Sequence, residues 1–120
     1  MDKIVQYIIV RKDLDMSPGK MSAQVAHASL GIIFGKSYPF VSEWAKGQAT
    51  KIILKAKDLN DLEKVMDKLG DNFFKFHAVY DACHTELERE TDKGTLTCIG
   101  VQPFLKSKIH PLIKRYQLYK

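Results

Sequence analysis

The sequence has 120 residues, which is enough for one domain around a single modest core and too few for a multi-domain protein. Hydrophobic residues make up 45% and charged residues 28%, as in soluble globular domains, and no apolar run approaches the roughly 20 residues that cross a bilayer, so we expect a cytoplasmic protein with no membrane partner. Nineteen basic and fourteen acidic side chains give a net charge of +5, which favours a polyanionic partner without proving one.

A strand and a helix are predicted in the first third of the chain. The segment IVQYIIVR, residues 4–11, is β-branched and almost continuously apolar, which is typical of a strand buried on both faces. Ser17 followed by Pro18 is a typical helix start, and no helix breaker occurs from Lys20 up to Gly31. We therefore expect a helix that starts at Pro18 and runs to Phe34 or beyond, unless Gly31 or Gly35 marks its end.

The rest of the chain continues this alternation of strands and helices. Its clearest element is an amphipathic helix that Asp58 or Asn60 can cap and that ends at Gly70, because its apolar residues recur at intervals of three and four. The pattern predicts a single α/β domain over residues 1–120 with a partly parallel sheet. The other predicted elements are a short helix over 39–46, strands over 50–55, 74–80 and 96–101, a helix after Pro103 with Pro111 in or near its first turn, and an edge strand formed by the terminal QLYK.

Basic residues are concentrated at the two ends of the chain, and most acidic residues fall between Asp58 and Asp92. If the fold brings the two ends together, a basic face results, as in many proteins that bind nucleic acids. The basic residues concerned are Lys3, Arg11, Lys12, Lys20 and Lys36 in the first third, and Lys106, Lys108, Lys114, Arg115 and Lys120 in the tail.

The first predicted helix has two kinds of side chain on its surface. Lys20, Gln24 and His27 are spaced by four and three, which places them on one polar stripe that starts at the helix N-terminus. Free backbone N–H groups and the helix dipole attract anions there. The same stripe is also typical of an ordinary solvated face. A separate stripe of Met21, Val25, Ala28 and Ile32 is expected to face the sheet.

A second cluster of polar residues is the segment VYDACHTE. Asp81 directly follows a predicted strand, and Thr85 lies in the next loop, where α/β proteins often place functional side chains. Asp81 is a candidate general base or orienting group, although aspartate is also a common turn residue. Adjacent Cys83 and His84 would point to opposite faces of an extended segment, so they are a poor nucleophile and base pair.

Motifs for metals and cofactors are missing from the sequence. It contains no HExxH, no P-loop and no GxGxxG, so we expect neither a metal nor a cofactor. Cys83 and Cys98 lie in different predicted elements without CxxC spacing, which favours reduced thiols.

Several segments, in order and over nearly the whole chain, resemble the type II peptidyl-tRNA hydrolase family. The resemblance implies a small α/β fold with a mixed four-stranded sheet flanked by helices, usually dimeric. It also implies metal-independent hydrolysis of the ester between a peptide and the 3′ ribose of tRNA, with peptidyl-tRNA as the partner. The segments are QYIIVRKDLDMSPGKMSAQVAHAS, Trp44 with GQATKIILKAKD, YDACHTE, GTLTCIGVQP and QLYK.

Carried over by position, the resemblance assigns roles to six residues. Asp81, alone or with His27, would activate or orient a water molecule, and Lys20 with Thr85 or Thr95 would stabilise the oxyanion or hold the terminal ribose and phosphate. Gln24 would position the backbone or a base of the substrate. The catalytic residues are thus Asp81, His27, Lys20 and Thr85, and the substrate-binding residues are Gln24 and Thr95.

The sequence departs from the family pattern around the second cluster. Cys83 and His84 stand where the family usually has Gly-Arg, so a permanent cation is replaced by a group that is mostly neutral at pH 7. The following loop carries four acidic residues that should repel a polyanion. These departures leave open a non-catalytic RNA-binding or adaptor module on the same fold, or an esterase with another substrate. The four acidic residues are Glu86, Glu88, Glu90 and Asp92.

Overall fold

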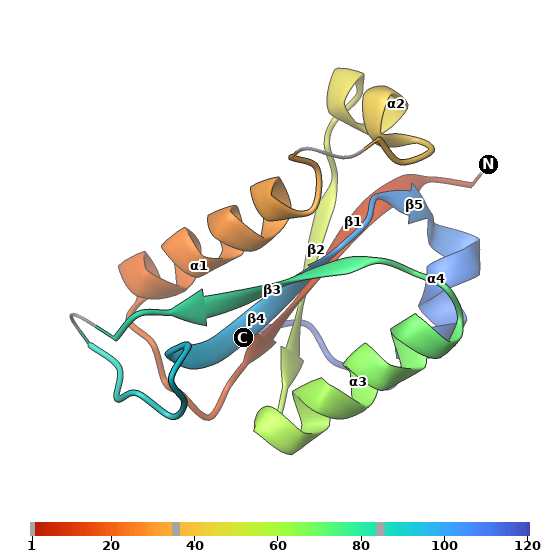
Figure 1. Ribbon diagram of the computed structural model, residues 1–120. Coiled ribbons are helices and arrows are strands. Elements are labelled where there is room, and N and C mark those ends of the chain that lie inside the picture. Colours follow the sequence, from red (N-terminus) through yellow and green to blue (C-terminus); the bar gives the residue numbers. More distant parts are fainter. Residues whose placement is uncertain (1, 35–36, 84–85) are drawn as a thin grey trace.

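The computed structural model describes residues 2–34, 37–83 and 86–120. It contains a mixed five-stranded sheet in which the order is β2-β1-β4-β3, with β5 pairing with β1 (Figure 1). The expected mixed, partly parallel α/β fold is confirmed, with one short strand more than expected. In chain order the elements are β1 Ile4–Arg11, α1 Pro18–Gly31, α2 Val41–Lys46, β2 Lys51–Ala56, α3 Leu59–Asp71, β3 Phe76–Asp81, β4 Thr95–Val101, β5 Phe104–Leu105 and α4 Lys106–Ile113.

The strand directions bring four chain segments to one edge of the sheet. β1 pairs with β2 in parallel, whereas β4 is antiparallel to both β1 and β3. The ends of β1, β2 and β3 therefore lie at the same edge as the start of β4. We call this the carboxyl edge; its strand residues are Arg11, Ala56, Asp81 and Thr95.

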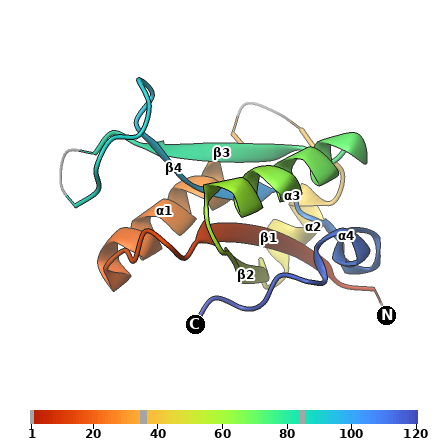
Figure 2. The same ribbon diagram turned by 90° about the horizontal axis from the view of Figure 1, so that it is seen from below.

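Helices cover both faces of the sheet. Side chains of β1 alternate between the faces, so that Val5, Tyr7 and Ile9 belong to a core shared with α3 and α4. Ile8 and Val10 belong to a second core shared with α1. The two views show α1 on one side of the sheet and α3 on the other (Figures 1 and 2). A strand buried on both faces was predicted for residues 4–11, and the prediction is confirmed.

The first helix lies unusually close to β4. A Cβ atom on Gly100 would lie 2.1 Å from the carbonyl oxygen of Ala28, which is far below a van der Waals contact. Glycine at this position therefore lets the backbone of α1 rest directly on the strand. The N-terminus of α1 is also fixed, since Ser17 accepts a hydrogen bond from the backbone N–H of Lys20 at 3.2 Å, as predicted for its cap.

Two predicted boundaries are wrong for identifiable reasons. α1 ends at Gly31, one of the two glycines that could mark its end, and not at Phe34; the N–H of Ile33 bonds to the carbonyl of Leu30 in a tighter turn at this point. β3 begins at Phe76 and not at residue 74, because Phe73 takes a positive φ of 66° and closes the end of α3.

The C-terminal region also differs from prediction. α4 begins at Lys106, which places Pro111 in its second half and not in its first turn. The terminal QLYK was expected to return as an edge strand; it lies beside β2 but forms only an isolated antiparallel bridge between Leu54 and Leu118.

Candidate active site

Two residues far apart in sequence meet at the carboxyl edge. Asp81 is the last residue of β3, and Lys20 lies in the first turn of α1. The Lys20 ammonium donates a hydrogen bond to Oδ1 of Asp81 at 2.6 Å, and the two residues form an ion pair. The pair joins the two polar clusters that the sequence had shown separately.

The pair is largely shielded from solvent, since the side chains of Lys20 and Asp81 are 17% and 10% exposed. Burial by itself raises the pKa of Asp81. The hydrogen bond from Lys20, the backbone N–H of Cys83 and the charge of Lys20 outweigh this effect, so the pKa lies below the ordinary value of 3.8. Asp81 is therefore an ionised carboxylate at neutral pH, and it has a cation directly beside it.

The backbone after β3 turns sharply around this carboxylate. The N–H of Cys83 donates to Oδ2 of Asp81 at 3.0 Å, and Cys83 has a φ of 66°. Its thiol lies 3.3 Å from the carbonyl oxygen of Asp81 and 3.4 Å from the hydroxyl of Thr95, and its single S–H can donate to either. Gly94, with a φ of 105°, closes the loop against Asp81, where a Cβ atom would lie 1.9 Å from the Asp81 carbonyl oxygen. Both ends of the loop between β3 and β4 therefore pack against Asp81.

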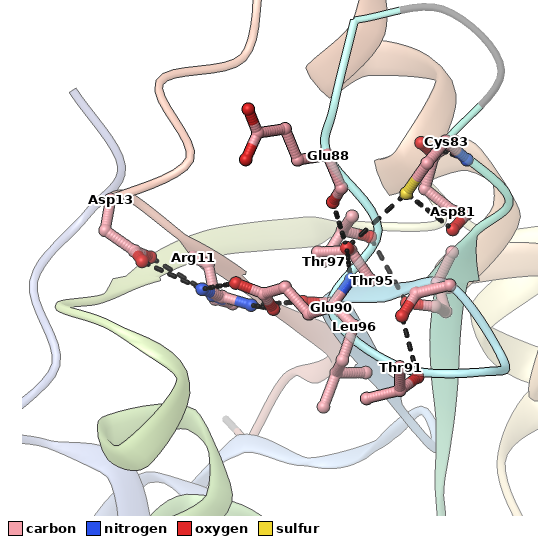
Figure 3. Close-up of polar contacts among 12 residues, drawn as sticks. Arg11, Asp13, Asp81, Cys83, Glu88, Glu90, Thr91, Thr95, Leu96 and Thr97 are labelled. Atoms are coloured by element: carbon pink, nitrogen blue, oxygen red, sulfur yellow. Dashed lines mark hydrogen bonds and ion pairs between the residues drawn. The ribbon is translucent and has the colours of Figure 1, made fainter.

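Thr95 is fully buried and holds this loop in place (Figure 3). Its hydroxyl donates to the carbonyl of Glu88 at 2.5 Å and accepts from the backbone N–H of Glu90 at 3.0 Å. With Cys83 as a further contact, the hydroxyl is engaged on several sides. In this conformation Thr95 supports the loop and does not face solvent.

The loop is attached to β1 by a buried arginine. Arg11 is 3% exposed and donates to both carboxylate oxygens of Asp13 and of Glu90, as Figure 3 shows. It also donates to the carbonyl of Leu96 at 3.0 Å. Burial lowers the pKa of Arg11, but the hydrogen bonds to Asp13 and Glu90 raise it well above its ordinary value. Arg11 is therefore a charged anchor for the acidic loop, and it is not part of the basic face that its sequence position suggested.

A carboxylate from the same loop occupies the N-terminal end of α1. Glu86 accepts hydrogen bonds from the backbone N–H of Ser17 at 2.7 Å and from its hydroxyl at 2.8 Å. These bonds lower the pKa of Glu86, and the charges of Lys20 and Asp81 act on it in opposite directions. The acidic loop thus directs one carboxylate to the place where the sequence predicted that an anion would bind.

The predicted polar stripe on α1 is wrong at Gln24. Gln24 is 3% exposed, and its side-chain oxygen accepts a hydrogen bond from the hydroxyl of Thr97 at 2.6 Å. It therefore faces β4 together with Ala28, whereas His27 is exposed to solvent. Periodicity alone could not show this, because the packing of the helix on the sheet decides which side of the stripe is buried.

Thr85, the fourth catalytic candidate, lies outside the described residues, as does His84. Sequence reasoning missed the contacts of Arg11, Ser17 and Glu86. The one usable signal was Arg11, since a charged residue that ends a buried strand needs a buried partner. Cys98 is also buried, and burial raises the pKa of its thiol to about 12, which makes it a poor nucleophile.

Within residues 2–34, 37–83 and 86–120, no three His, Cys, Asp or Glu side chains are grouped so that they could hold a metal ion. In the same part of the chain, no helix has the length and apolar character needed to span a membrane. Both described cysteines are free thiols, as expected.

Fold and site together define a small α/β protein whose mixed sheet presents a lysine–aspartate pair at its carboxyl edge. The family model described as peptidyl-tRNA hydrolase PTH2 matches residues 4–119, and the chain belongs to this family. The resemblance noted from the sequence motifs is confirmed.

Relatives from several organisms agree with this family. The chain is 36% identical over 114 residues to a peptidyl-tRNA hydrolase of Haloquadratum walsbyi, which covers 95% of this chain and 98% of that protein. It is 40% identical over 106 residues to that of Methanopyrus kandleri, with 87% and 88% covered. For that of Saccharolobus islandicus the identity is 32% over 112 residues, with 88% and 90% covered.

Proposed function

We propose that this chain hydrolyses the ester bond between a peptide and the 3′ ribose of tRNA, and so returns free tRNA to translation. Membership of the peptidyl-tRNA hydrolase PTH2 family supports this function, as do the names of the three relatives. The observation within the chain that carries it is the 2.6 Å contact between Lys20 and Asp81, which places a carboxylate and a cation together at a strand end. Ester hydrolysis needs both an acceptor for a water proton and a positive charge for the oxyanion.

In this mechanism Asp81 holds the attacking water. The carboxylate is ionised, so it can accept a hydrogen bond from water and direct the water oxygen at the ester carbonyl. A carbon–oxygen bond to the water forms, the bond to the ribose 3′ oxygen breaks, and the water proton passes by way of Asp81 to the departing ribose oxygen. Because Lys20 lowers the pKa of Asp81, the carboxylate is a weak base, and orientation of the water is its main contribution.

Lys20 supplies the positive charge in this scheme. Its ammonium lies beside Asp81, and the largely buried setting strengthens its attraction for a developing oxyanion. Lys20 also lies in the first turn of α1, where the helix dipole adds to the positive potential. A substrate anion that approaches this end of the helix has to replace the Glu86 carboxylate at Ser17.

We propose supporting roles for the remaining candidates. His27 is exposed and accessible to a bound substrate, and Thr85 follows Asp81 closely in the chain. Gln24 and Thr95 are buried and already hydrogen-bonded, so direct contact with substrate requires each to exchange its present partner. In the conformation described, their contribution is to position α1 and the acidic loop. We further propose a cytoplasmic homodimer that works without a metal ion.

The experiment is the cleavage of peptidyl-tRNA by the purified protein with and without EDTA. We expect equal rates, and we expect Asp81→Asn to lower turnover by roughly two orders of magnitude while the circular dichroism spectrum is unchanged. Loss of activity with EDTA that zinc restores would refute the metal-free mechanism. Binding of peptidyl-tRNA without any cleavage would instead favour the adaptor alternative.

A further inference from the structure

An open cleft with a volume of about 400 Å³ lies at the carboxyl edge, away from the Lys20–Asp81 pair. Four chain segments form it: the residues after β1, the end of β2, the first turn of α3 and the segment after α4. Its charged lining residues are Lys12, Asp13, Lys55, Lys57, Asp61 and Arg115.

The two carboxylates of this cleft are already paired with arginines. Asp13 binds Arg11 at 2.8 Å, and Asp61 binds Arg115 at 2.7 Å. Asp61 also accepts a hydrogen bond from the backbone N–H of Lys57 at 2.8 Å. Neither carboxylate therefore has to be neutralised by a lysine side chain of the cleft.

Three lysines supply the excess positive charge. Across the part of the chain that the structure describes, Lys12, Lys55 and Lys57 form no ion pair. The ammonium of Lys12, which lines the cleft, makes a cation–π contact 4.5 Å from the centre of the Tyr119 ring. Three lysine charges from two neighbouring strand ends suit a ligand with more than one negative charge.

The cleft and the Lys20–Asp81 pair lie on the same edge of the sheet but at different strands. β2 and β3 are the outer strands in the order β2-β1-β4-β3, so their ends are separated by three strand spacings, about 14 Å. Arg11 connects the two regions, because it binds Asp13 in the cleft and Glu90 in the loop around Asp81. A ligand that reaches both regions is therefore extended along this edge.

We propose that this cleft binds backbone phosphates of tRNA near its 3′ end while the Lys20–Asp81 pair acts on the ester, an inference that rests on the proposed function. A separation of about 14 Å corresponds to roughly four stacked nucleotides at about 3.4 Å each. Lysines contact phosphates as point charges and read no base, so recognition here is independent of the tRNA sequence. This suits an enzyme whose substrates share an ester and a phosphate backbone.

The test compares a cleft variant with a matched control. Lys55→Gln with Lys57→Gln removes two cleft charges, and Lys64→Gln with Lys68→Gln removes two charges from the exposed side of α3. Binding of deacylated tRNA, which carries no amino acid or peptide, is measured over a salt series. We expect the cleft variant to bind at least about tenfold more weakly at low salt, with the salt slope of log affinity smaller by roughly 1.4 to 1.8, and the control to keep the wild-type slope.

A second measurement separates this inference from the proposed function. Hydrolysis of peptidyl-tRNA is compared with hydrolysis of a short ester that carries the same peptide on adenosine alone. The kcat/KM for peptidyl-tRNA divided by the kcat/KM for the short ester should fall about tenfold or more in the cleft variant, because only peptidyl-tRNA reaches the cleft.

Equal salt slopes for the cleft and control variants would overturn the proposal, as would an equal loss on both esters. If the wild type cleaves neither ester, the proposed function fails. The binding of deacylated tRNA still decides whether the cleft holds phosphates. Lys12→Gln is a third variant in the cleft, and it should reduce the slope by roughly 0.7 to 0.9 if the double variant does not fold.

Discussion

The charge of Asp81 depends on Lys20. Burial favours the protonated form of Asp81, and the hydrogen bond and charge of Lys20 reverse that preference. A lowered pKa in the folded state means that the pair contributes stability above the ordinary pKa of 3.8 and that this contribution is lost as the pH falls through the lower folded-state value. The same contact thus sets both the ionisation of the carboxylate and part of the acid stability of the fold.

Lys20→Ala should therefore affect binding, turnover and pH dependence together. If Lys20 holds a phosphate, the salt slope of log affinity for tRNA falls by roughly 0.7 to 0.9. If it stabilises the oxyanion, saturated turnover falls by about a hundredfold. We expect a mixture of the two weighted to binding, because His84 replaces the arginine typical of the family and leaves fewer fixed cations.

The pH profile of Lys20→Ala provides the sharper measurement. Without Lys20 the burial of Asp81 remains while its main compensating contact is gone, so the pKa of Asp81 rises and the acid limb of kcat/KM moves to higher pH. Kinetics from pH 3 to 8, compared with the wild type, check this shift. A variant with unchanged turnover, salt slope and acid limb would remove the first helix from the site.

Glu86 is expected to weaken substrate binding. Its carboxylate occupies the N–H and hydroxyl of Ser17, and its charge lies close enough to act on Lys20 and Asp81. Glu86→Gln should raise the affinity for tRNA by about two- to fivefold at low salt and by less at high salt, since an exposed charge is screened. Titration of labelled tRNA checks this. Glu63→Gln, an exposed site on α3, is the control, and an equal gain there would show that only net charge matters.

At the level of elements, the position of α1 on the sheet decides the geometry of the site. The helix carries Lys20 and Gln24, and its backbone rests on β4 where a Cβ atom on Gly100 would lie 2.1 Å from the Ala28 carbonyl oxygen. Backbone atoms cannot rotate away as a side chain can. Any side chain at this position must therefore push α1 off the strand and separate Lys20 from Asp81.

Gly100→Ala should for this reason lower both stability and activity. Overpacking of this kind costs about 1–3 kcal/mol, and the shift of α1 should reduce turnover as well. Chemical denaturation and the ester assay measure the two effects. Gly70→Ala is the control, since a Cβ atom there meets no atom within 4 Å. If both variants unfold at the same denaturant concentration as the wild type, the close approach of α1 to β4 is wrong.

Sequence patterns predicted the elements better than their contacts. The apolar run of β1 and the cap at Ser17 follow from local chemistry, and both are confirmed. Gln24 was expected on a stripe separate from the one that faces the sheet, but its side chain packs against β4 and accepts a hydrogen bond from Thr97. Glu90 was expected to repel substrate, but its bond to Arg11 spans 79 positions in sequence, and such a pairing depends on the path of the whole loop.

At the scale of the whole molecule, the basic face predicted from the sequence is only partly formed in the folded protein. The sequence predicted a basic face if the two chain ends met, and Lys12 and Arg115 do line one cleft. Arg11 does not contribute, because it is buried between Asp13 and Glu90. Composition predicts the kind of partner, whereas the pairing of each charge decides which residues remain available to it.

Apolar side chains exposed near the end of α1 bear on the oligomeric state of the protein. Leu30 in the last turn of α1 and Phe34 in the turn that follows the helix are 48% and 69% exposed, which leaves apolar surface in contact with water. We expect this surface to be covered by a second copy of the chain in a symmetric dimer, as the family resemblance implies. The mass in solution should then be twice 13.7 kDa, about 27 kDa.

Light scattering at micromolar concentration measures this mass. Leu30→Ser with Phe34→Ser should shift the protein toward the monomer, because both exposed side chains lose their apolar surface. Phe73→Ser is the matched control, since Phe73 is 88% exposed but follows α3 and not α1. A wild-type mass of 13.7 kDa would contradict the dimer. A dimer that persists in the double variant but dissociates in the control would place the interface on the other side of the sheet, because α1 and α3 cover opposite faces.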